Sequence, residues 1–142
     1  MTESEAEPLF GDQGDDFLGG DEAHADLAGS LLKRRREIAQ WAAAALISRH
    51  PHVASYRGHK GVLACEQDLD FHLQHLHESV YTQAPETLQR YAAWIVAVLG
   101  RRGVPPTSVV VGVQVLGEAL LRFMPHPAGT ELRVLLWDAF GL

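Results

Sequence analysis

Several features that mark other classes of protein are scarce or missing in this chain of 142 residues. Its single cysteine, Cys65, excludes an internal disulfide and fits a reducing cytoplasm. It has no run of about 18 or more apolar residues and no apolar signal-peptide core, so we expect no membrane span. It also lacks a phosphate-cradling glycine loop, Gly-x-Ser-x-Gly and His-Glu-x-x-His. We therefore expect a cytoplasmic protein that is not an enzyme.

Positive charge is missing from residues 1–22, which hold eight acidic side chains and no Lys or Arg. The other residues hold twelve basic and ten acidic side chains, so this body is nearly neutral and does not indicate nucleic-acid binding. Residues 1–22 are rich in Gly, Asp and Glu and show no hydrophobic periodicity, which predicts a disordered acidic tail. Residues 23–142 are then one domain with a hydrophobic core.

Hydrophobic periodicity in the body predicts helix after helix. The expected helices are about 24–48, 62–81, 86–100, a fourth that starts after Pro105-Pro106 and continues to Arg122, and 128–140, with a loop at 50–61. The fourth segment contains the β-branched run 109–115, which on its own would also suit a strand. The paired prolines and the helical continuation favour a helix. The fold class predicted is all-α, a globin-like or bundle-like domain of five main helices.

The stretch Ala64–Leu73 carries the strongest functional signal. Helical spacing places Cys65, Asp68 and His72 on one stripe, together with Leu69 and other leucines, so the stripe should face inward. A buried carboxylate needs a partner, and a ligand with its own N–H groups would supply one. A lone cysteine is also often a plain buried apolar residue. A nucleophilic Cys65 with His72 as its base is disfavoured, because Cys65 lies within a helix rather than at its N-terminus, where thiolates are stabilised.

The histidines at the end of the same helix give a second hypothesis. His72 or His75 could serve as an axial ligand to haem iron in a globin-like fold. A zinc site is not favoured, because three histidines within six residues of one helix cannot close a tetrahedron alone.

Three blocks of the sequence resemble phycobiliproteins, in the same order along the chain. Ala64–Leu73 is similar to the bilin-attachment helix of the allophycocyanin β type. The segment 102–109 is similar to the Leu-Gly-Val-Pro segment of the family, and 128–142 resembles its C-terminal helix. The resemblance covers roughly residues 25–142 and lacks the family's N-terminal helical pair. In this respect, and in carrying Gln67 and His72, the chain looks like the bilin-biosynthesis-associated globins of non-photosynthetic bacteria.

The resemblance implies a role for each matching residue. Cys65 would form a thioether to a bilin, and Asp68 would accept hydrogen bonds from its pyrrole N–H groups. Lys60 matches a family arginine and, with Arg57 or His59, would pair with the propionates. The ligand would lie in a cleft between the helices at 62–81 and 86–100, beside Gln67 and His72, with Tyr91 and Trp94 as walls.

The function expected from these observations is binding of a linear tetrapyrrole, biliverdin or a derivative, as a carrier or sensor linked to bilin metabolism. A haem-binding globin and a ligand-free helical regulatory or interaction domain are the two alternatives. The resemblance also leaves open a homodimer and a contact with haem oxygenase or another protein of the bilin pathway.

Overall fold

The computed structural model describes residues 21–55 and 61–142, and within these ranges it contains helices and no strand. The helices are α1 (Asp21–Arg49), α2 (His52–Ser55), α3 (Gly61–Tyr81), α4 (Pro85–Arg101), α5 (Pro106–Phe123) and α6 (Ala128–Ala139). The all-α prediction with five main helices is confirmed, and the run 109–115 is helical. The short α2 was not expected, since a helix of four residues is too short to show a period.

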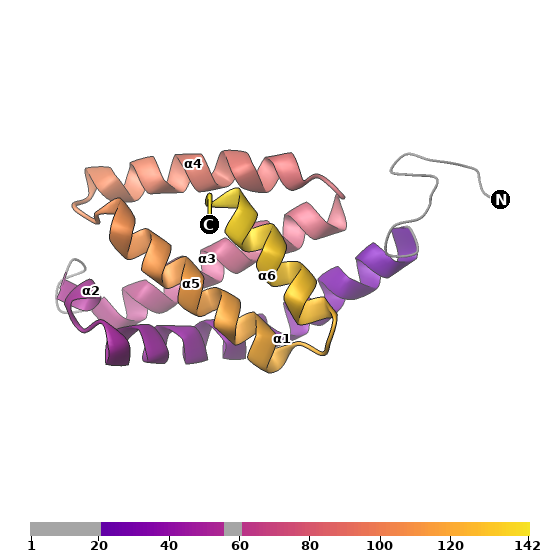
Figure 1. Ribbon diagram of the computed structural model, residues 1–142, viewed down its shortest axis with the longest axis horizontal. Helices are drawn as coiled ribbons and strands as arrows, with labels where there is room; N and C mark the ends of the chain where they lie inside the picture. The colour runs from indigo at the N-terminus through magenta and orange to yellow at the C-terminus, as the bar shows by residue number, and fades with distance from the viewer. Residues whose placement is uncertain (1–20, 56–60) are drawn as a thin grey trace.

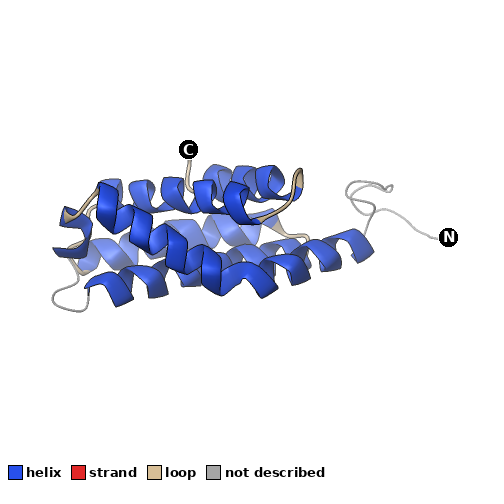
Figure 2. Cartoon of the chain, turned by 90° about the horizontal axis from the view of Figure 1, so that it is seen from below, coloured by secondary structure: helices blue, strands red, loops and turns tan. Residues whose placement is uncertain are grey.

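The first helix begins at Asp21, so the last two residues of the stretch expected as a tail are helical. The acidic Glu22 lies in its first turn, where negative charge interacts favourably with the helix dipole. The remainder of the expected tail lies outside the described residues. Both views show the N-terminal end of α1 extending beyond the other helices (Figures 1 and 2).

The core forms where α1, α3 and α5 pack together and α6 covers α5 (Figure 1). Its most deeply buried side chains are aliphatic, among them Leu31, Ile38, Leu73, Leu76, Leu116, Leu120 and Leu136. Burial of such side chains is the main stabilising term of the fold. Two ion pairs add links from α1 to its neighbours, Arg35 to Asp70 of α3 at 2.6 Å and Arg49 to Glu118 of α5 at 2.8 Å.

Among the described residues, α5 is the one helix long and apolar enough to cross a membrane, judged by length and composition alone. Half of it is buried inside the domain, which is the environment of a core helix. Its position against α1 and α6 therefore accounts for its apolar composition.

The corner between α4 and α5 follows from Gly103 and two prolines. Gly103 adopts a φ of +88°, which glycine reaches without strain, and the N–H of Val104 donates to the carbonyl of Leu99 at 2.9 Å. Pro105 and Pro106 then start α5, because proline is favoured in the first turn of a helix. This corner turns Val104 and the start of α5 back towards α3.

Candidate functional site

The inward stripe of α3 lines a small cavity of about 30 Å³. Cys65, Asp68 and His72 all face it, so the structure brings together the three residues that the spacing placed on one stripe. The Cys65 side chain is only 4% exposed and does not take part in a disulfide. The other lining residues come from α1 to α5 and from the α4–α5 corner: Leu46, Val53, Leu69, Leu99, Val104, Ser108, Val109 and Gly112.

Asp68 is half-buried rather than fully buried. It lies close enough to Tyr91 of α4 to act on its phenol: burial first, and the Asp68 charge second, raise the pKa of Tyr91 well above its ordinary value. The argument that Asp68 must have a ligand is therefore weaker, because it assumed a fully buried residue. Asp68 nevertheless lines the cavity.

A hydrogen bond joins His72 of α3 to Tyr91 of α4, with 2.5 Å between Nδ1 and the phenol oxygen. Both side chains are buried. Because the raised pKa keeps the phenol protonated, its O–H can donate to Nδ1, which places the proton of a neutral imidazole on Nε2. This hydrogen bond joins α3 and α4 at His72 and Tyr91.

Aromatic side chains fill the rest of that contact. The His75 ring stacks on Tyr91 with 3.8 Å between centroids, and Phe71 and Phe140 meet Tyr91 edge to face. The Nδ1–H of His75 donates to the carbonyl of Phe71 at 3.0 Å, since a carbonyl can only accept. The α3–α4 interface is therefore packed, and the cavity lies instead where α1, α2 and the α4–α5 corner meet α3.

Other residues expected at the site lie elsewhere. Gln67 is exposed, and Trp94 is 53% exposed and tilted against Tyr91 rather than lining the cavity. Tyr91 reaches the site through His72 and does not line the cavity. Lys60, with Arg57 and His59, lies outside the described residues.

The wall residues of α4 and α5 were missed, although Pro105-Pro106 marks the corner that brings Val104 and Ser108 to the cavity. The prolines predict a corner, but the sequence pattern does not show which helix that corner packs against. Within the described ranges, His, Cys, Asp and Glu side chains do not gather in any group of three that could hold a metal ion.

The fold and this stripe together define a class, the all-helical globin-like domains that carry a cysteine and a carboxylate on one inward helix face. The sequence model of the phycobilisome protein family matches residues 12–137 of the chain. The chain belongs to this family, which confirms the resemblance and the globin-like fold, and membership points to binding of a linear tetrapyrrole. The match begins ahead of α1, within the stretch expected as a tail. No curated protein matches the chain.

Proposed function

We propose that this protein binds a linear tetrapyrrole, a bilin of the biliverdin type, on the inward face of α3. The observation that carries the proposal is that Cys65, Asp68 and His72 line one cavity in a chain of the phycobilisome protein family. The proposal extends to a non-enzymatic role as a cytoplasmic carrier or sensor linked to bilin metabolism. The protein would form a homodimer and contact haem oxygenase or another protein of the bilin pathway.

The chemistry of these side chains fits the ligand. A bilin supplies pyrrole N–H donors and a conjugated system to which a thiol can be joined. The Asp68 carboxylate would accept from the N–H groups, a charge-assisted hydrogen bond that neither Asn nor Ser reproduces. The Cys65 thiol would add across a C=C bond of a ring substituent: the S–H bond and the π bond break, the sulfur bonds to one carbon, and the proton goes to the neighbouring carbon, which leaves a thioether. His72, hydrogen-bonded to Tyr91, lines the same cavity and would contact the ligand.

The volume of the cavity sets a condition on binding. About 30 Å³ is room for roughly one water molecule, whereas drug-sized ligands fill pockets of about 300–1,000 Å³. A bilin can enter only if the wall opposite α3, formed by Val53, Val104 and the start of α5, moves outward. We therefore expect binding to be coupled to a conformational change and to be slower than diffusion.

The test is an absorbance titration of the protein with biliverdin, followed by a denaturing gel examined for zinc-enhanced bilin fluorescence. The wild type should give a red-shifted, sharpened band. Cys65→Ala should abolish fluorescence on the gel, and Asp68→Asn should weaken binding by about tenfold or more, the loss of one charge-assisted hydrogen bond.

The matched control is Asp70→Asn, which removes a carboxylate two residues further along α3. Asp70 pairs with Arg35 and accepts from Gln74 at 3.0 Å, away from the cavity, so this variant should titrate like the wild type. Circular dichroism would verify that all variants fold. Wild-type titration curves for both Cys65→Ala and Asp68→Asn would refute the proposal.

A haem globin is the second candidate, and one contact favours it. The Nδ1–H of His75 donates to a backbone carbonyl, as in many metal-binding histidines, and this leaves Nε2 as the acceptor atom. The stacking of His75 on Tyr91 argues against it, because a rigid macrocycle would have to displace Tyr91. A sharp Soret band with haemin that disappears in His75→Ala or His72→Ala would establish the haem site. No response to either ligand would favour a ligand-free helical domain.

A further inference from the structure

A second and much larger cavity lies at the other end of the domain, and we name it the end pocket. Its volume is about 470 Å³, within the range of small-molecule sites. Its walls come from the first turns of α1, the end of α3, the turn to α4 and the exposed side of α6, and they include His24, Leu27, Val80, Pro85, Val134 and Leu135. Most of this surface is aliphatic.

One element beside the pocket, α6, packs closely on α5. Gly129 near its start has no Cβ, and a Cβ there would lie 2.8 Å from the carbonyl oxygen of Leu120. Glycine permits this close approach of the two helices. The N-terminal turns of α1 extend past the end of the helical body (Figure 1). The side chains between these two elements, such as Ser79, Val80 and Thr130, are short and leave the space unfilled.

The polar groups of the end pocket restrict the chemistry of a ligand. Glu131 is the charged residue among the described lining residues, and no Lys or Arg lines the pocket there, so an anionic ligand is disfavoured. The uncharged polar side chains among the lining residues, such as Ser79, Gln83 and Thr130, contribute very little of the surface that faces the pocket. Apolar walls with few polar groups are typical of sites for small organic molecules.

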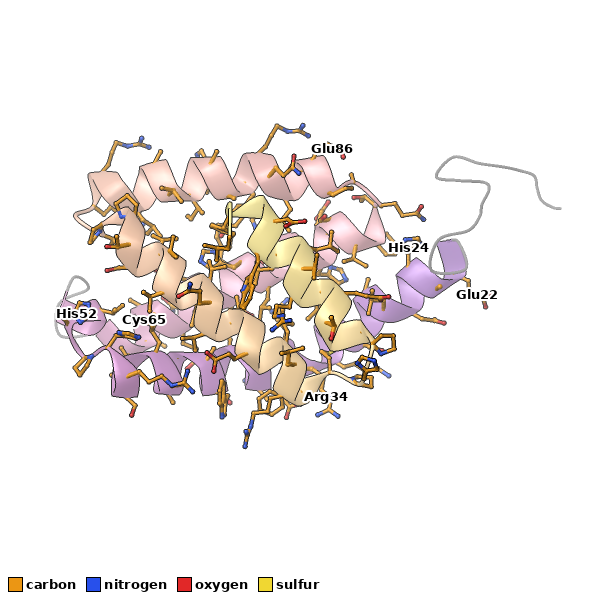
Figure 3. All side chains as sticks on the ribbon, in the orientation of Figure 1. Glu22, His24, Arg34, His52, Cys65 and Glu86 are labelled. Carbon is orange, nitrogen blue, oxygen red and sulfur yellow. The ribbon has the colours of Figure 1, made fainter. Side chains whose placement is uncertain are left out.

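We propose that the end pocket is a binding site for an uncharged, mainly apolar small molecule. This site is separate from the bilin site on α3. Figure 3 shows His24 and Cys65 at opposite ends of the molecule. Cys65 and Val80 stand on the same helix, and at about 1.5 Å per residue they are roughly 22 Å apart along its axis. The proposal does not depend on bilin binding.

The test is a fluorescence titration of the full chain with N-phenyl-1-naphthylamine, a neutral probe that brightens in apolar surroundings. The wild type should bind it saturably, with about one site per chain. Val134→Trp places an indole at the rim of the end pocket and should weaken binding by about tenfold or more. Val62→Trp is the matched control: Val62 is 56% exposed against 50% for Val134, and it lies at the other end of α3. It should leave the affinity unchanged.

Three results would overturn the proposal. The first is no saturable binding to the wild type. The second is equal affinity for wild type and Val134→Trp, which would place the probe elsewhere. The third is binding that appears only in a Phe17→Ser, Leu18→Ser variant, which would mean that the chain segment before α1 itself covers the pocket. Because biliverdin is absent from this titration, its outcome is independent of the bilin experiment.

Discussion

The phenol of Tyr91 and the imidazole of His72 are joined across the α3–α4 interface at 2.5 Å, one helix turn away from Asp68. This contact connects three groups that the sequence presents separately. Asp68 faces the cavity and acts electrostatically on Tyr91, and Tyr91 fixes the ring of His72. The side of the cavity formed by α3 is therefore held by a buried polar contact within an aromatic cluster.

The first prediction concerns the pH dependence of this contact. Because the pKa of Tyr91 is raised in the folded state, folding favours the protonated phenol. This stabilisation is complete below about pH 10, the ordinary pKa of tyrosine, and is lost as the pH rises further. Tyr91→Phe should lower the free energy of unfolding by about 1–3 kcal/mol at neutral pH, because the hydrogen bond between the phenol and His72 is lost. Its stability should fall less steeply above about pH 10. Urea unfolding at several pH values measures both effects.

Tyr81→Phe is the control for that experiment, because Tyr81 is 62% exposed and stands outside the cluster. It should have the stability of the wild type at neutral pH and the same alkaline slope. If Tyr91→Phe and the wild type lose stability in parallel above about pH 10, the raised pKa of Tyr91 is wrong.

Two glycines of α5 should respond oppositely to the same substitution. A Cβ on Gly117 would lie 2.3 Å from Nε1 of Trp137, whose N–H donates to the carbonyl of Val113 at 3.0 Å. Gly117→Ala must displace the indole and should destabilise the fold by about 1–3 kcal/mol. A Cβ on Gly112 would meet Leu69 at an ordinary 3.6 Å. Gly112→Ala should therefore stabilise the helix by up to about 1 kcal/mol, as measured by urea unfolding.

Equal destabilisation by both alanines would show that α5 is sensitive to any added volume, and would contradict the assignment of Gly117 as the point of close approach. Restored stability in a Gly117→Ala, Trp137→Leu double variant would support it, because the shorter side chain leaves room for the added methyl group.

Most of the fold could be predicted from the sequence because long amphipathic helices repeat their pattern many times. The β-branched run in α5 shows the limit of local preference: Val109, Val113 and Val115 are buried in a core helix, and packing outweighs their strand propensity. Pro105 and Pro106 correctly predicted a helix there, because proline is favoured in the first turn of a helix. The short α2 offered no such signal.

Only the part of the candidate site that lies on α3 could be predicted from the sequence. The spacing of Cys65, Asp68 and His72 fixes their common face, whatever lies opposite. Three other features depend on how helices distant in the sequence pack together. They are the burial of Asp68, the exposed fraction of Trp94 and the position of Val104 in the cavity wall. The end pocket depends on how α1, α3, α4 and α6 lie relative to one another, so no pattern in the sequence indicates it.

The end of α4 gives another matched pair of substitutions. Gly103 has a φ of +88°, a conformation that costs an alanine about 1–2 kcal/mol. Gly100 lies within the helix, and a Cβ there would meet nothing within 4 Å. Gly103→Ala should lower the free energy of unfolding by about 1–2 kcal/mol, and Gly100→Ala should raise it by up to about 1 kcal/mol. Thermal unfolding of the two variants would compare them, and a loss in Gly100→Ala would contradict the helix end described.

The last prediction uses the single thiol to measure how often the site opens. Cys65 is 4% exposed, so a reagent such as dithionitrobenzoate reaches it only when the wall formed by the α4–α5 corner moves away. We expect the native protein to react at least about a hundredfold more slowly than the urea-unfolded chain, and a Val62→Cys, Cys65→Ser variant to react at nearly the unfolded rate. Such protection would mean that the open form makes up at most about 1% of the population, and a bilin would then bind at least about a hundredfold more weakly than to a site already open. Fast reaction of the native thiol would show instead that the site is open in solution, and the slow binding proposed for bilins would not be observed.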